Sequence, residues 1–309
     1  MKRAIAVLLF FAGASLARAQ MPDEVSVNGV EFVRIPAGPF WYVVQKDYRN
    51  LLRPGEPVYR EVRVVLDEFY LAKYEARASD FVRFMNSSAA LQDFIGDPLY
   101  WTPLRNGCAV LYDPERGFVE RYPGRNLPAT AVSWQLARSF AAYMGFRLPT
   151  EAEWQKAYRG TDRRIWPWGN EYPDETHANF MSPAQCSPAA LDTYPKGRSP
   201  YGLHHMAGNV VEAVANWYNL TFDQSLRDGV SNPPLPDDPA VNEHHNGPTR
   251  IAKGGRWSST ADLIAVAYRF TTKEGDMNSS SGLRFATDSS VVARALAEGR
   301  ATVLVEKRQ

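Results

Sequence analysis

The sequence lacks the short motifs by which most redox cofactors and nucleotides are held. It has no G-x-G-x-x-G after an expected strand, no P-loop and no C-x-x-C-H haem motif. Its five histidines include the adjacent pairs His204–His205 and His244–His245, but no H-x-x-x-H spacing. Adjacent residues do not face one site on a helix, so a histidine zinc site is not expected. If the protein oxidises a substrate, no motif identifies the electron acceptor.

An excess of charge of one sign is also missing. The chain has 35 Lys and Arg against 34 Asp and Glu, a formal net charge of +1, and no basic face that would indicate a nucleic acid partner. Its 309 residues are 45% hydrophobic, which suits a globular fold with a real core. The 22 prolines and 21 glycines indicate many loops. Because no internal repeat or low-complexity segment occurs, we expect the mature chain to be one domain.

Long hydrophobic runs are absent except at the start. Residues 1–19 combine the basic Lys2 and Arg3 with an apolar stretch too short to span a bilayer, and end in the A-x-A motif Ala17-Arg18-Ala19. This pattern predicts a signal peptide, a mature chain that begins at Gln20, and a periplasmic protein with no membrane segment after cleavage. Removal of the three basic residues changes the formal net charge from +1 to −2.

Cysteine is scarce, with only Cys108 and Cys186. In an oxidising compartment the two could pair and close a long loop, or they could be two buried thiols. Sequence does not give the Cα separation that would decide between these alternatives. Export favours the disulfide.

Periodicity predicts both strands and helices. Residues 31–40 and 62–74 are rich in β-formers, whereas residues 91–128 have no sustained period and are expected to be loop-rich. The stretch ASDFVRFMNSS predicts a helix with Ser79 as its N-cap. A second helix, over QLARSFAAYMG, would be capped by Ser133 and stopped by Gly145.

The most specific stretch is RLPTEAEW, at residues 147–154. Thr150 followed by Glu153 is a capping box, and Trp154, Ala157 and Tyr158 share one face of the helix that it starts. The end of the chain holds a second distinctive stretch, residues 253–286. There, alternation around Arg269 and Arg284 predicts two strands in a core hairpin with a long polar connection.

Together these motifs resemble the formylglycine-generating-enzyme, or sulfatase-modifying-factor, family. The carriers are RLPTEAEW, WPWGN at 166–170, GLHHMAGNVVEAVANW at 202–217, RIAKGGRW at 250–257 and SSSGLRFA at 279–286. The resemblance spans residues 27–288 and implies an α+β fold, a variant of the C-type-lectin fold with much irregular structure. We expect the family domain over residues 20–288 and a C-terminal extension over residues 289–309.

The family's oxidases hold copper with two cysteines at a fixed distance after the Gly-Gly pair. Counting from Gly255 places these positions at Ser259 and Ile264, and neither residue supplies the thiolate that suits Cu(I). The family's active-site serine is replaced by Arg256. The resemblance therefore predicts that copper is not a cofactor.

The family also carries structural calcium, which takes oxygen ligands. One calcium site of the family maps onto His205, Gly208, Val210 and Glu212. There His205 replaces a side-chain oxygen donor, Gly208 and Val210 would give backbone carbonyls, and Glu212 would give its carboxylate. The other site begins at Asn179 and Phe180, but the Asp-Gly-Phe part that completes it has no match, so we expect that site to be lost or altered.

Candidate catalytic residues follow the Gly-Gly pair. Arg256 could stabilise a phenolate or carboxylate, and Trp257 could stack on a flat ring, with Ser259 beside them. Glu274 and Asp276 are candidate general bases. The alternative without a functional role is that Trp257 belongs to the core, Arg256 pairs with a neighbouring acid, and the carboxylates of Glu274 and Asp276 are exposed to solvent.

An exported family member without the copper cysteines resembles the branch that matures the siderophore pyoverdine. That resemblance implies oxidation of the dihydropyoverdine chromophore, with the small-molecule siderophore precursor and other periplasmic maturation enzymes as partners. Two alternatives remain. One is a non-catalytic ligand-binding module, because the lectin-like fold presents variable loops. The other is a formylglycine-generating oxidase, against which Ser259 and Ile264 argue.

Overall fold

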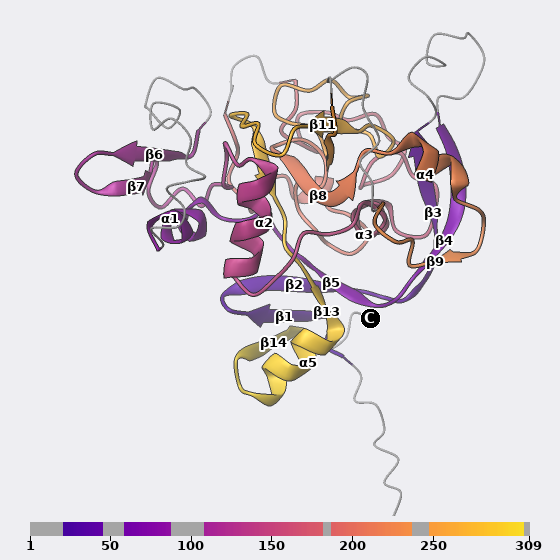
Figure 1. The fold of residues 1–309 in the computed structure, drawn as a ribbon, viewed down its shortest axis with the longest axis horizontal. Coiled ribbons are helices and arrows are strands. Elements are labelled where there is room, and N and C mark those ends of the chain that lie inside the picture. The colour runs from indigo at the N-terminus through magenta and orange to yellow at the C-terminus, as the bar shows by residue number, and fades with distance from the viewer. Residues whose placement is uncertain (1–20, 46–58, 88–107, 182–186, 237–246, 306–309) are drawn as a thin grey trace, which may run out of the picture.

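The computed structural model describes residues 21–45, 59–87, 108–181, 187–236 and 247–305. Within them, short helices and small sheets are joined by much irregular chain (Figure 1). This is the predicted α+β class in a single domain. The helices are α1 Ala78–Asn86, α2 Trp134–Tyr143, α3 Glu151–Arg159, α4 Leu220–Ser225 and α5 Ser289–Ala297, with a 3₁₀ turn at Pro195–Gly197. The strands are β1 Glu24–Val27, β2 Val30–Ile35, β3 Gly38–Gln45, β4 Tyr59–Leu66, β5 Phe69–Ala72, β6 Val110–Asp113, β7 Gly117–Glu120, β8 Val211–Trp217, β9 Val230–Ser231, β10 Arg250–Lys253, β11 Phe270–Thr272, β12 Ser281–Leu283, β13 Ala286–Asp288 and β14 Ala301–Val305.

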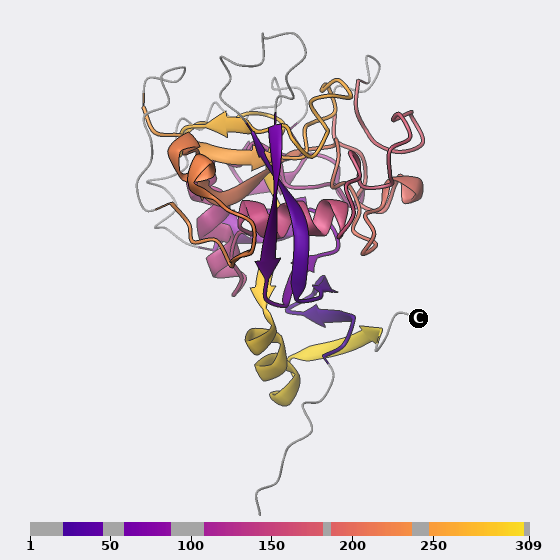
Figure 2. The ribbon, with the colours of Figure 1, turned by 90° about the vertical axis from the view of Figure 1, so that its right-hand side faces the viewer.

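The strands of the described residues form four sheets. The largest has the order β13-β5-β2-β1-β14, so the last strand lies antiparallel to the first (Figure 2). A four-stranded sheet has the order β11-β10-β8-β12, in which β12 is parallel to β8. The long antiparallel pair β3–β4 carries the short β9 at its edge, and β6 pairs with β7.

The strand predictions for the first third are largely confirmed. The run over residues 62–74 holds β4 and β5, and residues 31–40 hold β2 and the start of β3. Residues 31–40 were expected to form a strand that ends in a Pro-Gly turn; β2 ends at Ile35, because Pro36 has no N–H for a ladder, and β3 begins at Gly38. Within residues 91–128, the described part contains the hairpin β6–β7 rather than loop alone.

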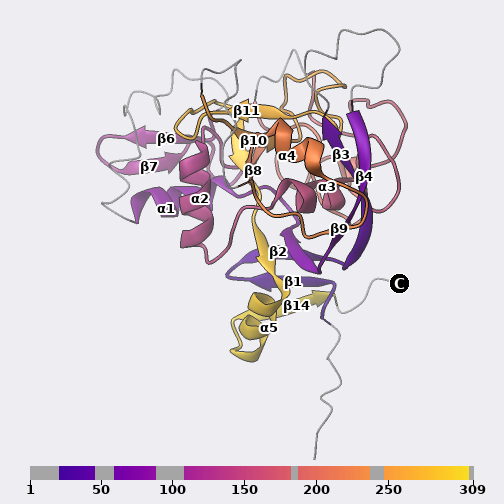
Figure 3. The ribbon, with the colours of Figure 1, turned by 45° about the vertical axis from the view of Figure 1, so that its right-hand side comes forward.

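The core hairpin predicted near the C-terminus is wrong. β11 and β12 lie at opposite edges of the four-stranded sheet, with β10 and β8 between them. Figure 3 shows β11, β10 and β8 of this sheet. Alternation of apolar and polar residues identifies a half-buried strand but does not identify its partner. The long connection between the two strands crosses the sheet and contributes to the site described below.

The helix starts divide into two confirmed caps and one error. Ser133 Oγ accepts from the backbone N–H of Leu136 at the start of α2, and Gly145 follows that helix with a φ of +82°. Thr150 and Glu153 form the predicted reciprocal capping box of α3. Ser79 is not an N-cap: α1 begins at Ala78, and its N-cap residue makes no side-chain cap hydrogen bond.

A buried network of ion pairs and hydrogen bonds joins four segments of the core. The Arg269 guanidinium lies between Glu151, at 2.7 Å, and Asp223, and the Tyr42 hydroxyl donates to Glu151 at 2.8 Å. Burial alone would raise the pKa of Glu151, but the charges of Arg269 and Lys253 outweigh it and lower that pKa to about 2. The network ties β3, α3 and α4 to the segment that leads into β11.

The C-terminal segment packs on the domain. Val292 and Ala295 of α5 are buried in the same hydrophobic cluster as Phe32 and Phe285, and β14 pairs with β1. Among the described residues no helix is long and apolar enough to cross a membrane. The predicted signal peptide, Cys186 and the pair His244–His245 lie outside the described residues, and Cys108 is buried.

Candidate functional site

A cleft of about 100 Å³ lies over the four-stranded sheet. Its apolar surface comes from small side chains of β8 and β10 and from the rings of Trp134 and Phe270. Val211 and Ala213 share one face of β8 because side chains alternate along a strand. Its polar surface comes from β11, from the loop before β12 and from the segment after β10. The lining residues are Val132, Trp134, Val211, Ala213, Ala252, Arg256, Phe270, Thr271, Thr272, Asp276, Asn278, Ser280, Ser281 and Gly282.

Two glycines set the turn that brings Arg256 to this cleft. Gly254 and Gly255 have φ values of +92° and +77°, which favour glycine, and a Cβ on Gly255 would lie 2.6 Å from Cγ2 of Ile264. After the turn, the Arg256 guanidinium lies 5.8 Å from the centroid of Phe270. Within the described part of the chain, Arg256 has no ion-pair partner, so it can interact with an anionic ligand.

Trp257 and Ser259, also predicted as site residues, lie outside the cleft lining. Trp257 is 5% exposed and donates its backbone N–H to the carbonyl of Asn209 at 3.0 Å. Ser259 is 1% exposed, and its Oγ accepts from the backbone N–H of Arg256 at 3.1 Å. Both residues are therefore buried beside the turn, where these hydrogen bonds help to hold it. The rings that line the cleft are those of Trp134 and Phe270.

Glu274 also points elsewhere. Its Oε1 accepts from Arg250 Nη2 at 2.7 Å and from Nε at 2.9 Å. The Arg250 guanidinium lies 3.7 Å from the ring centroid of Trp134 and 3.4 Å from that of Trp217. Glu274 thus holds a cation between two indoles, one of which forms a wall of the cleft. The sequence reasoning missed this role, although Arg250 opens the motif R-x-x-[RK]-G-G.

Asp276, the other carboxylate considered as a base, does line the cleft. It lies on a loop that is held at both ends. The Glu274 carbonyl accepts from Gln135 N at 3.1 Å, and the Ser281 carbonyl accepts from Val132 N at 3.1 Å. Among the described residues that line the cleft, the charged ones are one cation, Arg256, and one anion, Asp276.

The residues expected to bind calcium differ in whether their oxygen atoms already have partners within the protein. Glu212 is fully buried, and Arg284 contacts both of its carboxylate oxygens, at 2.6 Å for the closest, while Trp154 Nε1 donates to Oε2 at 2.7 Å. Gly208 and Val210, whose backbone carbonyls are the expected ligands, lie just before β8. The hydrogen bonds that they make to Gly254 O and to Glu75 come from their N–H groups, so the carbonyls stay predicted ligands. Because its oxygens are taken by an arginine and an indole, Glu212 does not fit as a calcium ligand in this arrangement.

Asn179 differs, because its Oδ1 is buried and has no hydrogen-bond partner among the described residues. Its Nδ2 donates to Ser187 O and to Asn209 Oδ1, both at 3.1 Å, which fixes the oxygen in the other direction. A lone amide oxygen suits a hard cation. The neighbouring Phe180 packs against the core, where its side chain supplies no ligand atom. Asn179 therefore fits one ligand of the calcium site that the sequence expected to be altered.

His205, the remaining member of the expected calcium set, is buried and neutral. Its Nε2 lies 3.0 Å from Ala190 O, and its Nδ1 has no partner among the described residues. Burial lowers the pKa of His205 to about 3. Within the described chain, no group of three His, Cys, Asp or Glu residues is arranged to hold a metal ion.

The two positions of the family's copper cysteines are both buried. Ser259 presents a hydroxyl that already accepts a hydrogen bond from Arg256 N, and Ile264 presents hydrocarbon. Neither supplies a soft thiolate, so this pair does not fit a copper–thiolate centre.

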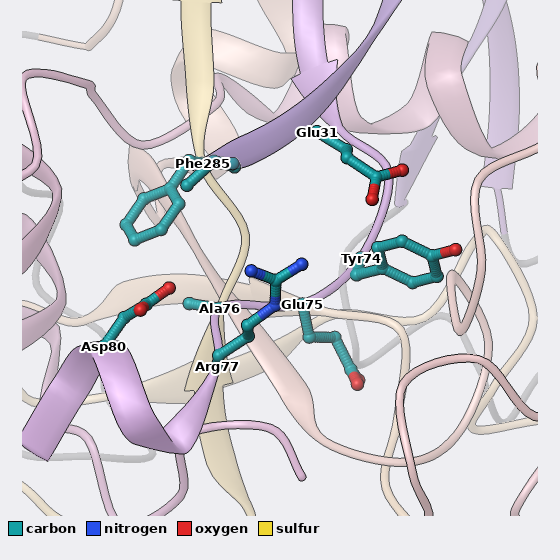
Figure 4. Close-up of a pocket in the computed structure, with 8 residues that line it drawn as sticks. Glu31, Tyr74, Glu75, Ala76, Arg77, Asp80 and Phe285 are labelled. Atoms are coloured by element: carbon teal, nitrogen blue, oxygen red, sulfur yellow. The ribbon is translucent and has the colours of Figure 1, made fainter. Parts of the chain in front are cut away.

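A second, much smaller crevice lies beside the first residues of α1 (Figure 4). Its volume is about 10 Å³, room for a single water molecule. The Arg77 guanidinium points into it between Glu31 and Asp80, whereas Glu75 points away (Figure 4). Glu75 instead accepts from Asn209 Nδ2 at 2.6 Å and from Val210 N at 3.2 Å. The crevice is too small for an organic substrate.

Comparison with known families agrees with the motifs. The model described as "Sulfatase-modifying factor enzyme 1-like domain" matches residues 17–289. The serine/threonine-protein kinase pkn1 of Chlamydia caviae is 31% identical over 267 residues, which is 83% of this chain and 38% of that protein. The formylglycine-generating enzyme of Mus musculus is 28% identical over 290 residues, covering 79% of this chain and 73% of that protein. The hercynine oxygenase of Mycolicibacterium smegmatis is 30% identical over 199 residues, covering 62% and 43%.

The chain spans only about a third of the length of the first of these relatives, the chlamydial kinases, at 33–38%. Among solved structures, Treponema denticola variable protein 1 has a TM-score of 0.59 at 20% identity, covering 86% of this chain and 98% of that one. PvdO from Pseudomonas aeruginosa has a TM-score of 0.58 at 21% identity, covering 87% and 100%. At these identities the two structures show the fold alone.

Proposed function

The chain belongs to the sulfatase-modifying factor family, and from this premise we propose that it carries out an oxidation of a small aromatic substrate in the cleft that holds Arg256. One relative, hercynine oxygenase, supports an oxidative role by its name. The observation that carries the proposal is the position of the Arg256 guanidinium on the turn after Gly254–Gly255. It lies 5.8 Å from the ring centroid of Phe270, in a cleft that Trp134 also lines, and has no ion-pair partner among the described residues. The resemblance implies that the copper cysteines of the family's oxidases follow the same Gly-Gly pair.

The finer proposal names the substrate as the dihydropyoverdine chromophore. The expected export of the chain and the substitution of both copper cysteines support it, as does the sequence resemblance to the pyoverdine-maturing branch. The solved PvdO structure contributes the shared fold. A ring bearing two hydroxyls matches a cleft in which Arg256 can stabilise phenolate charge while Phe270 or Trp134 packs on the ring.

The proposed step is a two-electron oxidation. The substrate loses two electrons and two protons, a new double bond forms in its ring system, and dissolved oxygen takes up both to become hydrogen peroxide. Arg256 lowers the free-energy cost of forming the phenolate from which the electrons leave, and Asp276, which lines the same cleft, can accept a proton. The protein thereby orients the ring and handles one proton, while oxygen is the oxidant.

The test is direct. Purified mature protein is incubated with dihydropyoverdine in air, and chromophore absorbance, oxygen uptake and peroxide are followed together. We expect one peroxide for each chromophore formed. Arg256→Ala should lower kcat/KM by about tenfold to a hundredfold, whereas Arg163→Ala, which removes an exposed guanidinium stacked on Trp41, should not.

The rival of a non-catalytic ligand-binding module predicts affinity without turnover. If the precursor binds but absorbance and oxygen stay constant over many equivalents, the oxidative proposal is wrong. A strain that lacks the protein gives the second readout, since accumulation of the reduced siderophore precursor is expected there.

A further inference from the structure

Two opposite charges line the cleft without neutralising each other. Arg256 lies on the turn after β10, and Asp276 lies on the loop before β12. Neither side chain has an ion-pair partner among the described residues. Nearby charges are already committed, because Glu274 pairs with Arg250 at 2.7 Å.

The loop that carries Asp276 is pre-formed. The Asp276 backbone N–H donates to Lys273 O at 3.1 Å, and that of Ser281 donates to Asn278 O at 2.9 Å. Asn278 Oδ1 in turn accepts from both the N–H and the hydroxyl of Ser280, at 3.0 and 2.8 Å. Consecutive turns of this kind fix the backbone before any ligand arrives, so less ordering entropy is lost on binding.

Part of the cleft lining is apolar. Small side chains of β8 and β10 line it, as do the rings of Trp134 and Phe270. Arg250 stacks on Trp134, with its guanidinium 3.7 Å from the ring centroid. A volume of about 100 Å³ accommodates one flat ring.

We propose that the cleft selects a dipolar ligand: a single flat ring that carries an anionic group toward Arg256 and a cationic group toward Asp276. This inference rests on the proposed function in that both place the substrate in the same cleft. It adds a requirement that the oxidation alone does not contain, a positive group on the substrate. A purely anionic aromatic would leave Asp276 beside the ligand without a partner.

Four catechols separate the charges. L-DOPA carries an ammonium and a carboxylate, dopamine an ammonium, 3,4-dihydroxyphenylacetate a carboxylate, and 4-methylcatechol neither. Binding of each to the full mature chain is measured by calorimetry under nitrogen, so that no oxidation takes place. We expect L-DOPA to bind about tenfold more tightly than either singly charged probe, and 4-methylcatechol most weakly.

The variants assign each charge to its residue. Asp276→Asn should weaken the binding of dopamine and L-DOPA by about tenfold and leave that of dihydroxyphenylacetate unchanged. Arg256→Gln should weaken the binding of dihydroxyphenylacetate and L-DOPA by about tenfold and leave that of dopamine unchanged. Asp276→Lys should make dihydroxyphenylacetate the preferred probe, which a variant that merely failed to fold could not do. The matched control is Asp262→Asn, an exposed acid that precedes β11 and accepts a hydrogen bond from the Thr260 hydroxyl.

Equal affinity for all four probes, or no binding of any, would overturn the proposal, as would an Asp276→Asn effect on the carboxylate probe alone. Because these measurements exclude oxygen, they are independent of turnover. If the protein shows the expected binding pattern but never oxidises dihydropyoverdine, the proposed function is wrong and this inference stands. If it oxidises dihydropyoverdine without showing the pattern, this inference is wrong and the proposed function stands.

Discussion

Glu274 and Arg250 form an ion pair at the edge of the cleft, with Glu274 Oε1 2.7 Å from Arg250 Nη2. The pair places the guanidinium between the indoles of Trp134 and Trp217. Stacking of this kind and the charge-assisted hydrogen bond reinforce each other, because the carboxylate holds the cation in the plane that the rings require. Glu274 therefore acts on the cleft through the position of Trp134 rather than as a base.

This arrangement predicts different outcomes for two neighbouring acids. Glu274→Gln should cost about 1 kcal/mol of unfolding free energy, a value already reduced for the partial exposure of the pair, and change kcat by no more than about twofold. Asp276→Asn should leave stability within about 0.5 kcal/mol and lower kcat/KM by about tenfold. Thermal unfolding and steady-state rates on the same preparations check both. A large loss of rate in a stable Glu274→Gln protein would restore Glu274 as a catalytic candidate.

The start of α3 gives a prediction about stability. Trp154 is 0% exposed and donates its indole N–H to Glu212 at 2.7 Å, so Trp154→Ala creates a cavity and removes a hydrogen bond from a buried carboxylate. We expect a loss of about 3–5 kcal/mol. Thr150→Ala, which removes one half of the capping box, should cost about 1 kcal/mol. Chemical denaturation measures both, and an unchanged midpoint for Trp154→Ala would contradict the structural role.

The features predicted correctly from sequence are local ones. The capping box of Thr150 and Glu153 joins residues three apart, and Ser133 caps the helix that follows it directly, so the short sequence contains both partners. The buried face with Trp154 follows from helical periodicity. The family resemblance supplied the overall fold, which composition and periodicity alone left as a mixture of strands and helices.

The features missed depend on distant partners. The order β11-β10-β8-β12 is set by packing across the chain, so alternation around Arg269 and Arg284 could not exclude a hairpin. Glu274 lies 24 residues from Arg250, and no spacing rule links them. Glu212 was expected to face a cation, and it does, but the cation is Arg284, 72 residues away.

The uncommitted oxygen of Asn179 leads to a prediction about metals. We expect Ca²⁺ to raise the thermal midpoint of the mature protein relative to excess chelator, and Asn179→Ala to remove that response. At a hundredfold excess over Kd the gain would be about 2.7 kcal/mol. Elemental analysis after Cu(I) loading should find no stoichiometric copper, given Ser259 and Ile264. The same midpoint with calcium and with chelator would contradict the calcium proposal, and one copper per chain would contradict the other.

His205 predicts how stability changes with pH. Burial lowers its pKa in the folded protein to about 3, against an ordinary value of 6.5. Between these values the unfolded chain binds a proton that the folded chain does not, so the free energy of unfolding falls as pH decreases. The contribution is fully present above about pH 6.5 and is lost as pH falls toward about 3.

The variant His205→Asn, which keeps a polar group without a titratable ring, should flatten this dependence. We expect the wild-type protein to lose about 2 kcal/mol more than the variant between pH 7.5 and pH 5. The neighbouring His204, whose pKa burial lowers to about 4, contributes a similar slope and stays in both proteins, so it cancels in the comparison. Urea unfolding at the two pH values measures the difference. Parallel curves for the two proteins would show that His205 is not held neutral in the fold.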